Sequence, residues 1–250
     1  MKAIQRVLDR DCVDPAAAGL CALAVMTKAP RAGLVKTRLV PPLTHDEAAQ
    51  LNICFLRDTA AAISQACGES ARGIAVYTPI GAEADYGDIL PHDFQLVAQR
   101  GDNFGDRLAF GVEDLFAIGF TSVCLIDSDS PTIPSKVYAE AVRLLSMPGD
   151  RVVLGPSDDG GYYLIGLKKN HRQLFENIAW STELVLDQTK ARGAELGVEI
   201  KLLAAGYDVD DRVTLYRLRD ELIRGDEEST NDVAPNTRGF LASLTTRRQL

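Results

Sequence analysis

Residues 123–131 read VCLIDSDSP, an apolar strand that runs directly into two acids, two hydroxyls and a proline. Strands buried in a parallel sheet are continuous apolar runs, and open α/β sheets bind ligands beyond the carboxyl ends of their strands. Asp127 and Asp129 stand at such an end, so they predict a divalent-metal site facing a polyanionic ligand. An Asp/Ser turn that caps the next helix is the alternative, and the spacing alone leaves both open.

Strands and helices alternate on both sides of this stretch. Short apolar runs predict the strands, while capping residues and apolar residues at helical spacing predict the helices. The expected strands span 20–26, 73–78, 94–97, 123–126, 151–154, 162–167 and 198–203, and the expected helices span 44–65, 103–119, 134–145, 183–196 and 207–222. This alternation predicts an α/β fold with a mainly parallel, Rossmann-like three-layer αβα sheet.

The chain divides into one large domain with two short flanking segments. Residues 20–224 are expected to form a single domain, because no linker or repeat interrupts them. Residues 1–19 predict a short amphipathic accessory helix with Ile4, Val7 and Leu8 on one side. Residues 225–250 are expected to form a polar C-terminal tail.

Composition excludes several classes of function. The chain has 250 residues and a formal net charge of -8, which argues against a general nucleic-acid surface. Its five cysteines occur at no metal-ligand spacing, so a reducing, cytoplasmic setting is expected. No apolar run is long enough to span a bilayer, and the first residues lack a signal-peptide pattern. We therefore expect a cytoplasmic monomer or homodimer that binds small molecules.

Well-known catalytic motifs are missing from the sequence. Residues 33–37 end in Lys-Thr but lack the spacing of a P-loop, and no GxGxxG follows the first strand. No HExxH, CxxC or GxSxG occurs, and the three histidines are scattered. Dinucleotide-dependent oxidoreduction, zinc hydrolysis and serine-triad chemistry thus lose their usual signals.

A basic loop, residues 27–38, follows the first strand. Lys28, Arg31, Lys36 and Arg38 supply four positive charges, and Gly33 lets a ligand approach the backbone closely. This pattern predicts binding of a nucleotide di- or triphosphate, although a solvated basic loop is the simpler reading.

Three later segments have both a structural and a functional interpretation. Asp158-Asp159-Gly160-Gly161 predicts a hairpin turn, or a turn in which Asp159 faces a ligand. Asp208 and Asp210 are typical of a helix start, and they become ligands only if they lie near Asp129. Trp180-Ser181-Thr182 is either a buried aromatic residue before a helix cap or an acceptor-side platform.

Six ordered blocks between residues 20 and 222 resemble a bacterial family of glycosyltransferases with a nucleotide-diphospho-sugar transferase (glycosyltransferase-A-like) fold. The blocks are TKAPRAGLVKTRL, QRGDNFGDRL, LIDSDSP, GPSDDGGYYLIGL, WST and YDVDD. The chain is more distantly similar to nucleotidylyltransferases that activate molybdopterin or 2-phospho-lactate. The resemblance implies this fold and a divalent-metal site.

The resemblance also implies roles for individual residues. The loop after the first strand would wrap the nucleotide through Lys28, Ala29, Pro30, Arg31, Gly33, Lys36 and Arg38. Asp129 would hold Mg²⁺ or Mn²⁺, with Asp210 as the second acid and Asp127 as a weaker candidate. Asp159 corresponds to the acid of the family's DGG block, which would lie on the substrate side.

Three functions follow as expectations. The first is metal-dependent transfer of a sugar from a nucleotide-diphosphate sugar to a small acceptor, with Asp129, Asp159 and Lys36 as catalytic residues. The second is nucleotidyl transfer from an NTP to a phosphorylated or hydroxylated acceptor, with release of pyrophosphate. The third is a nucleotide-binding protein without catalysis. Both enzymatic mechanisms require Lys36 and Asp210 to lie close to Asp129.

Overall fold

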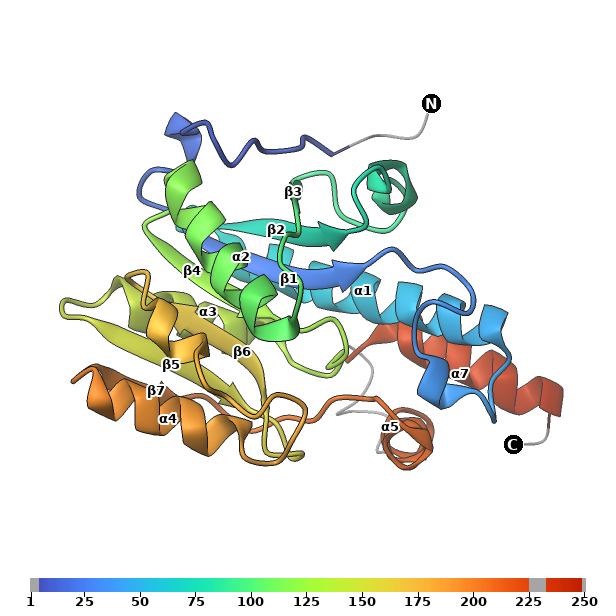
Figure 1. Cartoon of the computed structure of the whole chain (residues 1–250). Helices are drawn as coiled ribbons and strands as arrows, with labels where there is room; N and C mark the ends of the chain where they lie inside the picture. Colours follow the sequence, from blue (N-terminus) through green and yellow to red (C-terminus); the bar gives the residue numbers. More distant parts are fainter. Residues whose placement is uncertain (1–4, 225–232, 249–250) are drawn as a thin grey trace.

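The computed structural model describes residues 5–224 and 233–248, which fold around a seven-stranded sheet with helices on both faces (Figure 1). Its strands are β1 (Cys21–Lys28), β2 (Ala71–Thr78), β3 (Gln95–Ala98), β4 (Ser122–Ile126), β5 (Arg151–Pro156), β6 (Tyr162–Leu167) and β7 (Glu199–Leu202). Its helices are α1 (His45–Cys67), α2 (Phe104–Ile118), α3 (Ser135–Ser146), α4 (Val185–Glu195), α5 (Arg212–Arg224) and α7 (Pro235–Arg248). Short 3₁₀ turns are η1 (Pro15–Ala17), η2 (Thr37–Leu39), η3 (Glu83–Tyr86) and η4 (Arg172–Phe175).

The strand order, β3-β2-β1-β4-β6-β5-β7, creates a switch point between β1 and β4. The chain builds outward from β1 through β2 to β3 and then crosses to the other side of β1 to form β4, which pairs with β1 in parallel. Open α/β sheets bind ligands in the crevice at such a reversal. The predicted α/β fold class is confirmed, and β6, antiparallel to β4 and β5, makes the sheet mixed.

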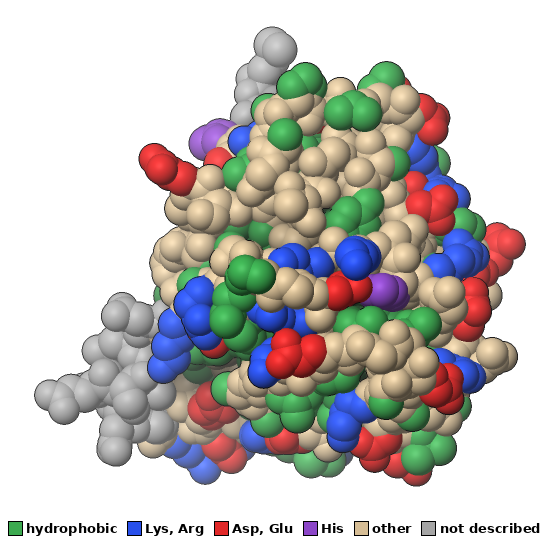
Figure 2. Space-filling view, turned by 90° about the vertical axis from the view of Figure 1, so that its left-hand side faces the viewer, with side chains coloured by type: hydrophobic (Ala, Val, Ile, Leu, Met, Phe, Trp, Pro, Cys, Tyr) green, Lys and Arg blue, Asp and Glu red, His purple; other side chains and the backbone are tan. Residues whose placement is uncertain are grey.

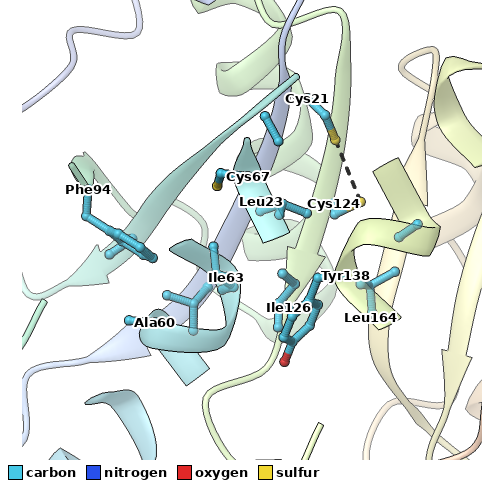
Figure 3. Packing of buried hydrophobic residues seen from close by; sticks show 14 of the residues in the cluster. Cys21, Leu23, Ala60, Ile63, Cys67, Phe94, Cys124, Ile126, Tyr138 and Leu164 are labelled. Atoms are coloured by element: carbon cyan, nitrogen blue, oxygen red, sulfur yellow. Dashed lines mark hydrogen bonds between the residues drawn. The ribbon is translucent and has the colours of Figure 1, made fainter. Parts of the chain in front are cut away.

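Two apolar layers hold the helices on the sheet. On one face, α1 and α3 cover the strands through a core that includes Leu56, Ile63 and Tyr138. Figure 3 shows this core, in which the Sγ atoms of Cys21 and Cys124 lie 4.0 Å apart. On the other face, the core of α2 packs on the strands together with η4 and the partly buried apolar side of α4. The result is the expected three-layer arrangement.

The capping residues that predicted the helix boundaries occupy those positions. Thr44 accepts from the backbone N–H of Glu47 while the Glu47 carboxylate accepts from the backbone N–H of Thr44, which completes a capping box at α1. The Asn103 side chain caps α2, and Gly119 ends that helix in the left-handed region with φ 115°.

The predicted N-terminal helix over residues 1–19 is wrong where the structure describes it. Val7 forms a bridge with Leu96 of β3, the Leu8 backbone donates to the Leu96 carbonyl, and only η1 is helical. This segment forms hydrogen bonds with the backbone of the edge strand β3. These bonds stabilise an extended conformation more than the weak helical periodicity stabilises a helix. Ile4 lies outside the described residues.

The predicted polar tail over residues 225–250 is also wrong for its second half. Helix α7 lies along α1 (Figure 1) and buries Leu241 and Leu244 in a third core, which α1 and α5 share. Asp58 of α1 accepts hydrogen bonds from the backbone N–H groups of Asn236 and Thr237, the first turn of α7. The polar composition of this segment gave no sign of these contacts. Residues 225–232 lie outside the described part of the chain.

Three further observations concern the cysteines, the membrane-spanning potential of the helices and the charges on the surface. All five cysteines are free thiols. No helix in the described ranges combines the length and apolar character needed to cross a bilayer. Figure 2 shows one end of the molecule, where basic and acidic side chains lie next to one another.

Candidate functional site

Lys36 lies where the loop after β1 meets β4 and the start of α5. Its backbone adopts the left-handed conformation, with φ 48° and ψ 36°, and its side chain is only 5% exposed. The Nζ atom lies 2.8 Å from Asp129 Oδ1 and donates to Asp210 Oδ1 and to the Val209 carbonyl, both at 2.9 Å. The predicted convergence of Lys36, Asp129 and Asp210 is confirmed.

The backbone fixes this geometry independently of the side chains. The Val209 N–H donates to the Asp129 carbonyl at 3.0 Å, which ties the segment before α5 to the end of β4. Asp211 turns away and accepts from the Thr214 N–H, so it caps α5. The two neighbouring acids therefore have different roles: Asp211 caps the helix, and Asp210 pairs with Lys36.

Asp127 organises the loop that carries Asp129. It accepts a 2.7 Å hydrogen bond from the Ser130 hydroxyl, and the Asp129 backbone N–H donates to it at 3.4 Å. Burial, followed by the charge of Asp129, raises the pKa of Asp127 to about 8. Asp127 therefore holds a proton at neutral pH and leaves Asp129 as the charged member of the pair.

The electrostatics around Lys36 favour its charged form. Burial lowers the pKa of Lys36, but the carboxylates of Asp129 and Asp210 more than offset this and hold it above the ordinary value. Burial also raises the pKa of Asp208, and the nearby Asp159 and Asp210 raise it further. Asp208 accepts from the Ser157 hydroxyl at 3.2 Å.

A small cavity of about 290 Å³ opens beside Lys36, and we call it the basic cavity. Its polar lining comprises Lys28, Lys36, Thr37, Arg38, Asn52, Ser128, Asp129 and Asp210. Within the described residues, neither Lys28 nor Arg38 is paired with a carboxylate. Two cations are thus available for an anionic ligand, in addition to the paired Lys36.

The other predicted loop residues do not line this cavity. Arg31 points to Asp85, at 2.8 Å. Ala29 is buried, Pro30 is half-buried, and Gly33 takes φ 75° to turn the chain. Lys28, Lys36 and Arg38 are therefore brought together at the site, whereas Ala29, Pro30, Arg31 and Gly33 shape the loop.

Asn52 is a candidate binding residue that the sequence reasoning missed. It lies on α1 with 5% exposure, lines the basic cavity, and its buried Oδ1 has no hydrogen-bond partner in the protein. An unsatisfied buried amide costs roughly 1–3 kcal/mol, which a bound ligand or water would recover. The sequence did contain one indication of this role: Asn52 is a polar residue on the apolar face of the helix, between Leu51 and Phe55.

A second cavity, of about 630 Å³, adjoins the first at Arg38, Ser128, Asp129 and Asp210, and we call it the large cavity. Trp180 and Phe104 form one wall, with ring centroids 5.2 Å apart in an edge-to-face pair. Gly105 makes room for them, because a Cβ there would lie 2.4 Å from Trp180 Nε1. Trp180 is thus part of a cavity wall.

Asp159 lies in the large cavity at the tip of the β5–β6 hairpin. Its Oδ1 accepts from the Gly161 N–H at 2.9 Å, so the segment forms the expected turn, and the same residue lines the cavity. Its neighbour Asp158 points away and pairs with Arg217 at 2.7 Å. Asp208 and Asp127 line the same cavity.

The residues at the junction of the two cavities fit a divalent cation by their donor chemistry. Mg²⁺ and Mn²⁺ prefer oxygen ligands, commonly one or two carboxylates completed by phosphate oxygens and water. Asp129 and Asp210 supply two carboxylates that already share one positive charge, the Lys36 ammonium. No group of three or more potential metal-ligating side chains occurs among residues 5–224 and 233–248, so phosphate and water would have to complete such a site.

Comparisons with known proteins agree with this architecture. Residues 59–182 match the family described as "Uncharacterized protein conserved in bacteria (DUF2064)". No curated protein matches the sequence. A crystal structure from Desulfovibrio desulfuricans G20, provisionally named a nucleotide-diphospho-sugar transferase, is 25% identical, with a TM-score of 0.79 over 92% of this chain and 96% of that one. The family resemblance and fold expected from the sequence are thereby confirmed.

Two more distant structures share the fold. One is CMP:2-keto-3-deoxy-manno-octonic acid synthetase complexed with CTP, with 11% identity and a TM-score of 0.53 over 82% of this chain and 99% of that one. The other is a nucleotidyl transferase from Methanothermobacter thermautotrophicus, with 16% identity and a TM-score of 0.53 over 84% and 100%. At these identities the similarity concerns the fold alone.

Proposed function

We propose that this protein is a metal-dependent glycosyltransferase that takes a sugar from a nucleotide-diphosphate donor and passes it to a small acceptor. The observation that carries the proposal is Lys36, held 2.8 Å from Asp129 and 2.9 Å from Asp210 where the two cavities meet. The similarity to the Desulfovibrio protein, whose provisional name is a nucleotide-diphospho-sugar transferase, supports it.

In this proposal the junction holds the donor's phosphates. Arg38 and Lys28 contact phosphate oxygens from the basic cavity, and Lys36 keeps its charge beside them. Asp129 and Asp210 would hold Mg²⁺ or Mn²⁺, which would supply positive charge near the diphosphate. Preorganised positive charge at a leaving group lowers the barrier without reorganisation during the reaction.

The acceptor occupies the large cavity, with Asp159 as the proton acceptor. Its carboxylate is exposed to the cavity, and only Oδ1 is engaged, by the Gly161 N–H. The second oxygen can take the proton of an acceptor hydroxyl as the hydroxyl attacks the sugar carbon. Breaking the bond between sugar and diphosphate then leaves the nucleoside diphosphate in the junction.

Nucleotidyl transfer is the second candidate, and the basic cavity favours it. Its lining includes Lys28 and Arg38, neither of which pairs with a carboxylate among the described residues. The triphosphate of an NTP carries more negative charge than the diphosphate of a nucleotide sugar, so these two cations suit an NTP at least as well.

A ligand panel tests both candidates. Thermal unfolding is measured with each NTP and each common nucleotide sugar, with and without Mn²⁺, and a ligand at a hundred times its dissociation constant stabilises by about 2.7 kcal/mol. The best ligand is then incubated with candidate acceptors. Release of a nucleoside diphosphate supports glycosyl transfer, and pyrophosphate identifies nucleotidyl transfer. Metal-dependent binding without turnover of any acceptor identifies a non-catalytic nucleotide-binding protein.

Asp129→Asn tests the metal site, and Asp158→Asn is its matched control. It removes the charge that would hold the metal while keeping the side chain's shape, so metal-dependent stabilisation by nucleotide should disappear. Asp158→Asn removes a carboxylate of the same size that pairs with Arg217 outside the site, and nucleotide binding should persist. Equal nucleotide binding by the wild type and Asp129→Asn would refute the proposed metal site.

A further inference from the structure

The lining of the large cavity combines an aromatic part and an acidic part. The aromatic part is Phe104, which is 51% exposed, with Trp180 edge-to-face against it. The acidic part outside the junction with the basic cavity includes Asp159 at the tip of the β5–β6 hairpin, Glu183 and Asp208. Among the described residues that line it, Arg38 is the single Lys or Arg, and it sits at the boundary with the basic cavity.

This distribution of charge separates two ligand chemistries. Cations and hydroxyls suited to phosphate gather in the basic cavity, whereas the large cavity presents carboxylates and an aromatic face. A phosphate or carboxylate placed in the large cavity would face like charges at short range, without a basic partner apart from Arg38. An uncharged hydroxylated molecule can donate hydrogen bonds to the carboxylates instead.

The backbone of α2 leaves space for the aromatic wall at Gly105. Gly105 lies so close to the indole that a Cβ there would be 2.4 Å from Trp180 Nε1 and 3.1 Å from Cε2. The start of α2 thus receives the Trp180 ring edge, and Phe104 holds it from the side. Partly exposed aromatic rings at a cavity commonly provide a flat apolar surface for a ligand ring.

We propose that the large cavity takes an uncharged, hydroxylated ring compound as acceptor, stacked on Trp180 and hydrogen-bonded to the acids of the lining, and that it rejects phosphorylated or carboxylated acceptors. The inference rests on the proposed function, since it names the acceptor class of that transferase. It also restricts the second candidate, because nucleotidyl transfer to a phosphorylated acceptor is excluded and only transfer to a hydroxylated one remains.

The protein reports on this cavity directly, because Trp180 is its only tryptophan. Fluorescence excited selectively over tyrosine therefore comes from the proposed platform. Caesium and iodide quench by collision, and an acidic surrounding enriches the cation and repels the anion. We expect a larger ratio of caesium to iodide quenching than for free N-acetyltryptophanamide at the same ionic strength. An equal or smaller ratio would overturn the inference.

A charge reversal locates the effect. Glu183→Lys changes the cavity's charge at an exposed side chain, and it should raise iodide quenching. Glu140→Lys makes the same change in net charge on α3, which covers the opposite face of the sheet, and the quenching ratio should stay at the wild-type value. Equal effects of the two variants would show that net charge, not the cavity, governs the ratio.

Matched ligand pairs test the acceptor class. Trp180 emission is titrated with glucose against glucose 6-phosphate and with myo-inositol against its monophosphate, in the presence of the donor found by the panel or, failing one, with Mn²⁺ alone. The neutral member should bind at least about tenfold more tightly, equivalent to roughly 1.4 kcal/mol, and Glu183→Lys should narrow the difference. Equal or tighter binding of a phosphorylated member, or no response to either neutral compound, would overturn the inference.

Failure of this inference and failure of the proposed function look different. If the protein binds nucleotide with metal and turns over a phosphorylated acceptor, the transferase stands and the acceptor class is wrong. If Trp180 reports neutral ligands but no nucleotide stabilises the protein with metal, the acceptor class stands and the donor assignment is wrong.

Discussion

Lys36 Nζ lies 2.8 Å from Asp129 Oδ1, and the same ammonium reaches Asp210 at 2.9 Å. One buried cation thus neutralises two carboxylates that arrive from distant parts of the chain. Its position also makes Lys36 the most informative residue to change, because it affects the stability of the metal-free protein and the binding of the donor in different ways.

Replacing Lys36 with Met should destabilise the metal-free protein by about 2 kcal/mol, because two carboxylates then face each other without a cation. This value is below the usual loss for a buried pair, because Asp210 is half exposed and solvent screens its charge. A divalent cation can replace the missing charge, so Mn²⁺ should raise the Tm of Lys36→Met more than that of the wild type. Identical Tm shifts in both proteins would contradict metal binding by Asp129 and Asp210.

Replacing Asn52 with Leu separates ligand binding from folding. The metal-free variant should be as stable as the wild type, or more stable by about 1 kcal/mol, because the unpartnered amide no longer has to be buried. Nucleotide affinity should fall by about tenfold through the loss of one hydrogen bond. Unchanged affinity in a titration calorimeter would remove Asn52 from the donor site.

Asp127→Asn should flatten the pH dependence of stability in metal-free protein. The raised pKa of Asp127, about 8, means that the folded state keeps a proton that the unfolded state releases at its ordinary, lower pKa. The wild type therefore loses this contribution as pH rises through about 8, whereas the amide has no proton to lose. Urea unfolding midpoints measured from about pH 6 to pH 9 test this. Parallel profiles for the two proteins would mean that Asp127 is charged when folded.

Removing the Asp58 carboxylate should release helix α7 without altering the site. Asp58 accepts hydrogen bonds from the backbone N–H groups of Asn236 and Thr237, at 3.0 and 2.8 Å. It also accepts one from the Asn236 side-chain amide, at 2.7 Å. Asp58→Ala should cost about 2 kcal/mol and increase amide exchange across 235–248, with donor affinity retained. Asp93→Ala, which removes an exposed acceptor for Ser64 of the same helix α1, should change stability by less than about 0.5 kcal/mol.

The sequence predicts the parts of this structure that follow from local chemistry and sheet topology. A buried strand ending in Asp127-Ser128-Asp129, a basic loop after the first strand and an acidic turn before a helix have to meet when parallel strands end at one edge. That reasoning brings Lys36, Asp129 and Asp210 together. It does not fix side-chain direction, which is why Arg31 is found on Asp85 instead of in the basic cavity.

The missed elements depend on partners that are distant in sequence. Residues 5–8 form part of a sheet edge because β3 offers unpaired backbone groups, and nothing in their own periodicity reveals that edge. Helix α7 depends on a carboxylate in the middle of α1 for its first turn. Asn52 becomes a candidate binding residue only because the fold places it in the same cavity as Lys28, at the end of β1, and Arg38.

The Val209–Asp129 backbone bond and the Lys36–Asp210 pair also govern when the site can exist during synthesis. A nascent chain presents the basic loop and β4 long before the segment that carries Val209 and Asp210 emerges from the ribosome. Contacts between residues this far apart form late, because the loop between them must close first. Nucleotide binding at the proposed site thus requires that synthesis has passed Asp210, so nucleotide would stabilise chains that include this residue and leave shorter ones unprotected.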